Sequence, residues 1–150
     1  MIEKEFNEVY TKFKLKFYQS MFQKVQDREM TLTAVETFSI EIIHSMDKPT
    51  VSEFAAFVGI SLPNATYKVN SLMNKGYLKK IQSKDDKREY HLEVTDKYMQ
   101  YYNMSSSYIN TVLKRVEEQF ADETVVLQKV LSAMSNELMP ELDGLQRVKY

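Results

Sequence analysis

The chain has 150 residues, enough for one domain with its own core, and its 43% hydrophobic content argues against a disordered chain. The sequence contains no cysteine, which excludes disulfides, thiolate metal sites and cysteine nucleophiles, and no apolar run approaches the roughly 20 residues of a membrane span. Because the formal net charge is −1, a nucleic-acid partner would have to be recognised by a local excess of cations.

The first predicted element is a long amphipathic helix over residues 2–25. Only three glycines and three prolines occur in the chain, which favours long helices joined by short links. Glu3, Lys4 and Glu5 interrupt the opening apolar residues, so no signal-peptide pattern is present and we expect a cytoplasmic protein. A polar break follows at residues 27–29. The apolar stripe advances in steps of three or four residues: Ile2, Phe6, Val9, Phe13, Phe17, Met21 and Val25.

The second predicted helix is capped by Thr31 or Thr33, and Glu36 completes a capping box with Thr33. The segment 47–49, which ends in a proline, stops this helix. Its expected buried face consists of Val35, Phe38, Ile42, Ile43 and Met46.

Two shorter helices follow, separated by only three residues. Thr50 and Glu53 form a second capping box, and Gly59 ends that helix. Ser61 then caps the next helix, whose Pro63 lies in the first turn, where a missing N–H does no harm. This spacing predicts a helix-turn-helix, in which the second helix enters the DNA major groove. The expected inward residues of the pair are Phe54, Ala55, Val58, Ala65, Val69, Leu72 and Met73.

After Gly76 the periodicity changes from that of a helix to that of a strand. Residues 77–81 and 90–94 are predicted strands, and residues 83–88 form the polar loop between them, so a hairpin wing follows the helix-turn-helix. Between Ser61 and His91 there are seven lysines and arginines against three acidic residues, a surplus of four positive charges. Such a surplus suits DNA phosphates, although a merely solvated cationic face has the same composition.

Helical spacing resumes after the hairpin. Thr95 is the expected cap of a helix that extends to Phe120, and Asp122 is the expected cap of a last helix that Pro140 ends. The predicted fold class is therefore mainly α with a small β-hairpin wing. The apolar surface of the outer helices exceeds what one small domain can cover, which indicates a partner, although packing within the monomer is the alternative.

Two motifs together resemble the MarR family of winged helix-turn-helix regulators. Asp86 and Arg88, one residue apart, precede an alternating strand and Thr95, while Leu72, then Lys75-Gly76, end the second helix of the pair. The resemblance implies one MarR-like domain over 1–150, with dimerisation helices at 1–30 and 96–150 and a winged helix-turn-helix lobe at 31–95. It also implies a homodimeric repressor of a pseudo-palindromic operator on double-stranded DNA, commonly relieved by a small ligand.

The candidate DNA contacts lie at the start of the second helix of the pair and on the wing. Asn, Thr and Lys side chains can bond base edges, and Tyr67 can reach a phosphate. Arg88 can enter a narrow minor groove, and Asp86 can hold it by a paired hydrogen bond. The alternative is that these polar residues only solvate an exposed helix and an unstructured hairpin tip. The predicted contacts are Thr50, Ser61, Pro63, Asn64, Thr66, Tyr67, Lys68, Asn70, Lys84, Asp86, Lys87 and Arg88.

Several apolar residues at helical spacing could line a crevice that binds an apolar or aromatic effector, although ordinary core packing gives the same spacing. His44 and Glu41 could supply half of a metal site, but a histidine near a helix end is more often structural, so we expect no metal and no cofactor. No catalytic constellation is visible, so we expect no enzyme; the alternative function is a winged-helix protein-interaction module without DNA binding. The effector candidates are Phe13, Phe17, Phe38, Ile42, Met46 and Tyr98.

Overall fold

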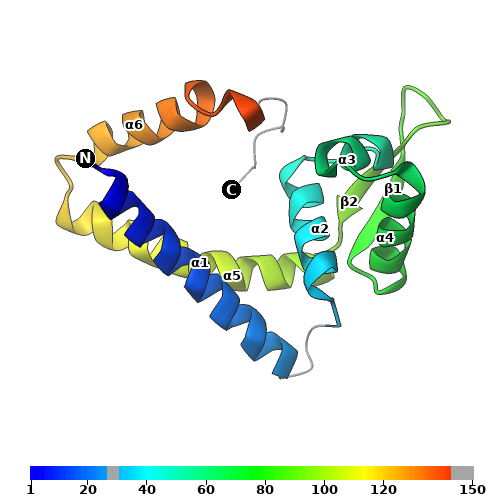
Figure 1. Ribbon diagram of the computed structural model, residues 1–150, viewed down its shortest axis with the longest axis horizontal. Coiled ribbons are helices and arrows are strands. Elements are labelled where there is room, and N and C mark those ends of the chain that lie inside the picture. Colours follow the sequence, from blue (N-terminus) through cyan, green and yellow to red (C-terminus); the bar gives the residue numbers. More distant parts are fainter. Residues whose placement is uncertain (27–30, 143–150) are drawn as a thin grey trace. The chain divides into compact units, whose positions relative to one another are not determined.

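The computed structural model describes residues 1–26 and 31–142, so the predicted polar break at 27–29 lies outside the described residues. The fold is mainly helical with one two-stranded hairpin, as the sequence predicted. The chain forms two compact units (Figure 1). Of the described residues, one unit contains 1–26, 31 and 102–142, and the other, the lobe, contains Leu32–Tyr101.

The first unit contains α1 (Glu3–Gln26), most of α5 (Asp96–Gln119), α6 (Thr124–Glu137) and a short 3-10 helix (Pro140–Leu142). Phe13 of α1 packs edge-on against Tyr108 of α5, with 6.1 Å between the ring centroids. The expected cap Asp122 was wrong: Glu123 occupies the N-cap of α6, and its side chain makes no capping hydrogen bond. No helix within the described residues is both long and apolar enough to cross a membrane.

The lobe contains α2 (Ala34–Ser45), α3 (Val51–Val58) and α4 (Leu62–Asn74), followed by β1 (Leu78–Gln82) and β2 (Tyr90–Val94). Capping boxes begin α2 at Thr33 and α3 at Thr50, and the Ser61 hydroxyl caps α4 by accepting from the Asn64 N–H. Gly59 ends α3 with φ +74°, a left-handed conformation that glycine adopts without steric cost. The predicted helix boundaries are confirmed here because each depends on contacts within four residues.

The hairpin is antiparallel, and its register pairs Leu78 with Val94 and Lys80 with Leu92. β2 has the predicted bounds, whereas β1 begins one residue later than predicted. The Leu92 N–H donates to the Pro49 carbonyl over 2.7 Å, which ties the hairpin to the segment after α2. At the base of the hairpin, the Thr95 hydroxyl donates to the Gly76 carbonyl over 2.7 Å.

The core of the lobe lies where α2, α3 and α4 pack against the base of the hairpin. The predicted buried face of α2 was wrong at Val35 and Phe38, which are 53% and 52% exposed, and α3 leaves Val58 39% exposed. Instead α2 buries the adjacent face, on which Glu36, Ile40 and Ile43 are spaced four and three residues apart. The buried apolar residues of the lobe are Leu32, Ile40, Ile43, Phe54, Ala55, Ala65, Val69, Leu72, Tyr77, Leu78, Leu92 and Tyr98.

Glu36 connects α2 to the C-terminal end of α4. Its carboxylate accepts hydrogen bonds from the Ser71 hydroxyl (2.5 Å), the Lys75 ammonium (2.7 Å) and the Thr33 N–H (2.8 Å). Burial raises the pKa of this carboxyl, but the hydrogen bonds from Lys75, Ser71 and Thr33 outweigh burial and hold the pKa at about 2, below the ordinary 4.5. The carboxylate is therefore ionised in the folded protein at any pH above about 3.

We predict that Glu36→Gln lowers the free energy of unfolding by about 1–2 kcal/mol at pH 7, because a charged hydrogen-bond acceptor is lost. The pKa is depressed in the folded state, so this contribution is fully present above about pH 4.5 and is lost as the pH falls towards 2. The difference between wild type and variant should shrink by about half between pH 7 and pH 3 in urea denaturation followed by circular dichroism. A difference of constant size over that range would contradict the assignment.

Candidate nucleic-acid interface

The exposed side of α4 offers hydrogen-bonding groups without any opposing carboxylate. Ala65, Val69 and Leu72 are completely buried, so the opposite side of the helix faces solvent. Tyr67 is 76% exposed, and the sequence of α4 contains no acidic residue. Along the predicted contact region of α4, Ser61, Pro63, Asn64, Tyr67 and Asn70 are exposed, while Thr66 and Lys68 are half-buried.

The beginning of α4 combines an exposed cap with an exposed first turn. The Ser61 hydroxyl lies 3.3 Å from the Asn64 N–H that it accepts from, and the Thr66 hydroxyl donates back to the Leu62 carbonyl over 2.8 Å. Thr50 caps α3 in the same way and is half-buried. The N-terminus of a helix favours an anion such as a phosphate, because its N–H groups and its dipole point toward the ligand.

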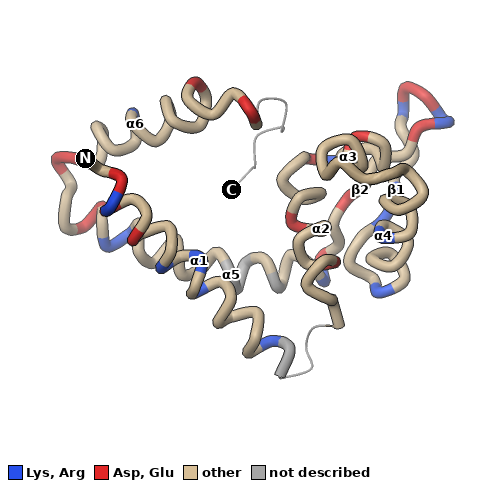
Figure 2. The backbone as a smooth tube through the Cα atoms, in the orientation of Figure 1, with Lys and Arg blue, Asp and Glu red and all other residues tan. Residues whose placement is uncertain are grey.

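The wing tip is an ordered turn rather than an unstructured loop. The Ser83 N–H donates to the Glu89 carbonyl (2.9 Å), and the Ser83 hydroxyl accepts from the N–H groups of Asp85 and Asp86 (3.2 and 3.4 Å). Gln82 Nε2 donates to the Lys87 carbonyl over 2.5 Å. These bonds shape the turn at the tip of the hairpin, where three basic and three acidic residues lie close together along the loop (Figure 2).

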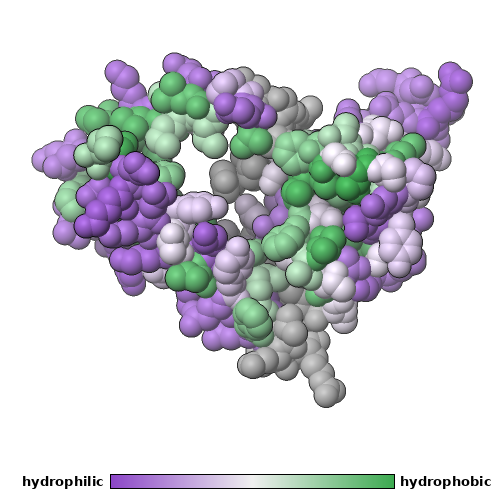
Figure 3. Space-filling view, viewed as in Figure 1, coloured by the Kyte–Doolittle hydropathy of each residue, from purple (hydrophilic) through white to green (hydrophobic). Residues whose placement is uncertain are grey.

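Asp86 holds both the backbone and the side chain of Arg88. One carboxylate oxygen, Oδ1, accepts from the Arg88 N–H over 2.9 Å and lies 3.6 Å from Arg88 Nε. This geometry differs from the predicted paired hydrogen bond, because the same oxygen serves both groups. The Arg88 side chain is 94% exposed, and Lys84 and Lys87 are exposed beside it, so hydrophilic residues cover the wing tip (Figure 3). Asp86 thus shapes the turn, and Arg88 remains available to a partner.

Sequence reasoning found Glu36 only as part of a capping box and missed its bonds to α4. Ser71 and Lys75 lie 35 and 39 residues away from it, beyond the reach of any local pattern. One signal in the sequence pointed to a buried partner. Glu36 lies four residues before Ile40 and so shares the face of α2 that is buried. Lys75, counted above among the cations available to DNA, is therefore engaged in an ion pair.

The effector candidates fall into the two separate units. Phe13 and Phe17 belong to the first, and the other four belong to the lobe, so the crevice between them stays a prediction. Tyr98 is buried and packs edge-on against His44, with 5.7 Å between the ring centroids. Burial lowers the pKa of His44, against the opposing charge of Asp47. A cavity of about 260 Å³ nearby is lined by His44, Leu92 and Met99 among others, and its described lining includes none of the predicted effector residues.

Comparisons with known proteins agree with this geometry. Residues 32–90 match the model of the MarR family, whereas a comparison with curated proteins found no match. The fold is similar to that of the transcriptional regulator Tm0710 from Thermotoga maritima, with 17% identity and a TM-score of 0.65 over 91% of this chain and 96% of that one. It is also similar to a MarR family protein from Bacillus stearothermophilus (14% identity, TM-score 0.64, 92% and 93% covered).

Two further similar structures contain DNA. One is a MepR mutant from S. aureus bound to an oligodeoxyribonucleotide, with 16% identity and a TM-score of 0.54 over 89% of this chain and 98% of that one. The other is FabT from Streptococcus pneumoniae in complex with DNA, with 20% identity and a TM-score of 0.51 over the same shares. At these identities the likeness is one of fold. The predicted resemblance to the MarR family is confirmed by the match of residues 32–90 to the family model, and the chain shares its fold with the MarR family protein from Bacillus stearothermophilus.

Proposed function

We propose that the protein is a sequence-specific, DNA-binding transcription regulator. The observation that carries the proposal is that one unit presents both an exposed helix face without carboxylates and an ordered wing turn on which the Arg88 side chain is 94% exposed. A helix of this kind fits the major groove, and a wing that follows it reaches the neighbouring minor groove. The match of the same residues to the MarR family, and the DNA bound to two proteins of similar fold, support this function.

The predicted contacts divide into two roles on this proposal. Asn64, Tyr67 and Lys68 meet base edges or phosphates from the first turns of α4, and Asn70 extends that face. On the wing, Arg88 enters the minor groove, where the negative potential of a narrow groove attracts a guanidinium. The caps Ser61 and Thr50 each present a helix N-terminus to a phosphate, while Lys84 and Lys87 make phosphate contacts of low sequence specificity.

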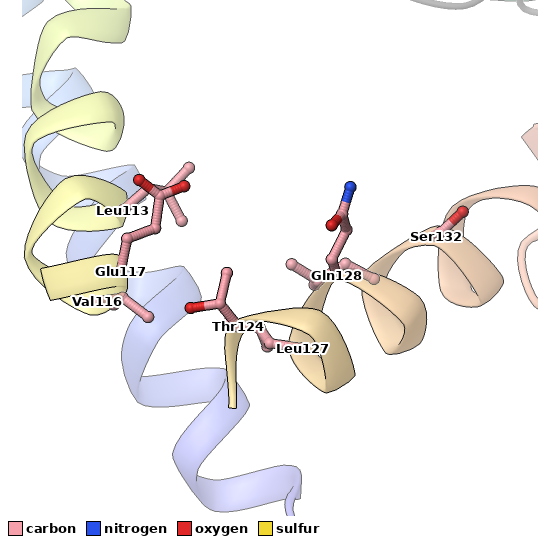
Figure 4. A pocket seen from close by; sticks show the side chains of 8 residues that line it. Leu113, Val116, Glu117, Thr124, Leu127, Gln128 and Ser132 are labelled. Carbon is pink, nitrogen blue, oxygen red and sulfur yellow. The ribbon is translucent and has the colours of Figure 1, made fainter. Parts of the chain in front are cut away.

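A homodimer is part of the same proposal, joined through the helices at 1–30 and 96–150. None of the residues of α6, all of them described, is buried, and Val125, Val126 and Leu138 are each more than 60% exposed. Between α5 and α6 lies a hollow of about 490 Å³ whose wall is largely apolar (Figure 4). Apolar surface of this extent favours a partner, and a two-fold dimer would present two lobes to a pseudo-palindromic site.

Repression, release by a small apolar or aromatic ligand, a cytoplasmic location and the organisation as one domain complete the proposal. These features follow from the resemblance to the MarR family. Catalysis is no part of the proposed function.

The proposal predicts that the purified protein enriches genomic fragments that share an inverted repeat, because two identical lobes read two identical half-sites. Sequencing of the bound fragments identifies the operator. Fragments without any common motif would contradict the proposal and favour a winged-helix module that binds proteins instead.

We predict that Arg88→Ala weakens operator binding at least tenfold, because its minor-groove contact is lost while the fold is not. The measurement is a gel-shift titration, with size-exclusion chromatography to verify that the assembly is unchanged. Arg115→Ala is the matched control, since Arg115 is an exposed arginine of α5 outside the lobe. Equal affinities for the two variants would refute the role assigned to Arg88.

The affinity for DNA should also depend steeply on salt. Several phosphate contacts release several counterions, so we expect affinity to fall by orders of magnitude between about 50 and 200 mM salt. Fluorescence anisotropy at a series of salt concentrations measures the slope. A partner protein held by apolar burial would give an almost flat slope, which is the result expected of the alternative function.

A further inference from the structure

We infer that Glu36 is a positioning residue for DNA recognition: through Ser71 and Lys75 it holds α4 at one position and rotation on the lobe. The inference rests on the proposed function, because it concerns how accurately α4 meets a base sequence. Glu36 itself is buried on α2 and is not among the predicted DNA contacts.

The first argument is that the hydrogen bonds of Glu36 add direction to the packing of α4, as does the bond that Lys97 Nζ donates to the Lys75 carbonyl (2.8 Å). Ala65, Val69 and Leu72 are completely buried, and this packing determines which side of α4 faces inward, but apolar burial itself is not directional. Hydrogen bonds to a carboxylate are short and directional, and here two of them reach residues one helical turn apart on α4. Two such bonds determine both the height and the rotation of the helix end.

The second argument concerns the energetics of a buried ion pair. Lys75 and Glu36 approach to 2.7 Å with side-chain exposures of 31% and 11%, so both charges have lost much of their hydration. The loss of hydration offsets most of the attraction in such pairs, and apolar residues of similar size often stabilise a fold as well or better. The best-attested effect of a buried charge pair is to select one arrangement among several, which is the effect needed here.

The third argument is the separation of the anchor from the contact region. The anchor is at Ser71 and Lys75, near the C-terminal end of α4, whereas the predicted base contacts begin at Asn64. Asn64 and Ser71 lie about 10 Å apart along the helix, at about 1.5 Å per residue. Because the helix is continuous between them, a tilt at the anchor displaces the contacting side chains. The same carboxylate accepts from the Thr33 N–H, so it also holds the residue through which the chain enters α2.

The test compares Glu36→Gln with Glu53→Gln. Glu53 forms a capping box of the same geometry at the start of α3, with its carboxylate 2.9 Å from the Thr50 N–H, but the bonds described for it include none to α4. Affinity is measured by fluorescence anisotropy for the selected operator and for a scrambled duplex of equal length, at one salt concentration. Circular dichroism identifies a temperature at which both variants are fully folded.

We expect Glu36→Gln to reduce operator affinity about tenfold, the size of effect expected when one well-placed base contact is lost. The affinity for the scrambled duplex should stay within about twofold of the wild-type value. Glu53→Gln should leave the ratio of the two affinities unchanged, because a charge beside the Thr50 cap acts on the phosphates of both duplexes alike. A purely structural role would lower both affinities together by reducing the folded fraction. An equal decrease of the two affinities would therefore overturn the inference, and so would no decrease in either affinity.

A second variant approaches the same bonds from α4. Ser71→Ala should also lower operator affinity selectively, and adding it to Glu36→Gln should cause no further loss, because both changes break one link. Fully additive losses would overturn the inference, and this variant remains informative if Glu36→Gln does not fold. A wild-type protein without any operator preference would overturn the proposed function itself, whereas retained preference in the variants would overturn only the role of Glu36.

Discussion

The burial of one side of α4 is the constraint on which the rest of the lobe depends. Ala65, Val69 and Leu72 lie four and three residues apart, so they form one stripe, and all three are completely buried. A helix that buries one stripe must turn the opposite one to solvent, and in α4 that stripe is polar and carries no carboxylate. The candidate DNA-reading surface is therefore a direct consequence of core packing.

The wing tip is positioned by local hydrogen bonds and not by burial. Its strands have too few buried side chains to define the tip, and order there comes from short-range hydrogen bonds of Ser83, Asp86 and Gln82. The presence of an acid on a surface proposed to bind DNA is thereby explained, because Asp86 closes the turn that carries Arg88. The lobe thus combines a helix positioned by burial with a tip positioned by local bonds.

The two units differ in how complete their cores are. The lobe buries a full set of apolar residues, and Glu36 adds a polar contact between α2 and α4. The first unit leaves large apolar side chains exposed on α1, α5 and α6. Such surface is stable only when something covers it, which is why the proposed dimer is placed there while the proposed reading of DNA is placed on the lobe.

The sequence alone determined the features that arise within about four residues of chain. The caps Thr33, Thr50 and Ser61, the turn at Gly59, the bounds of β2 and the MarR-like wing pattern were all predictable, because caps and turns are local hydrogen bonds with residue preferences. Only the tertiary structure decided which face of α2 turns inward, where Val35 and Phe38 were expected and Ile40 is found, and which distant groups meet Glu36. Those outcomes depend on how each helix is rotated against the others, and rotation is set by packing between residues far apart in the chain.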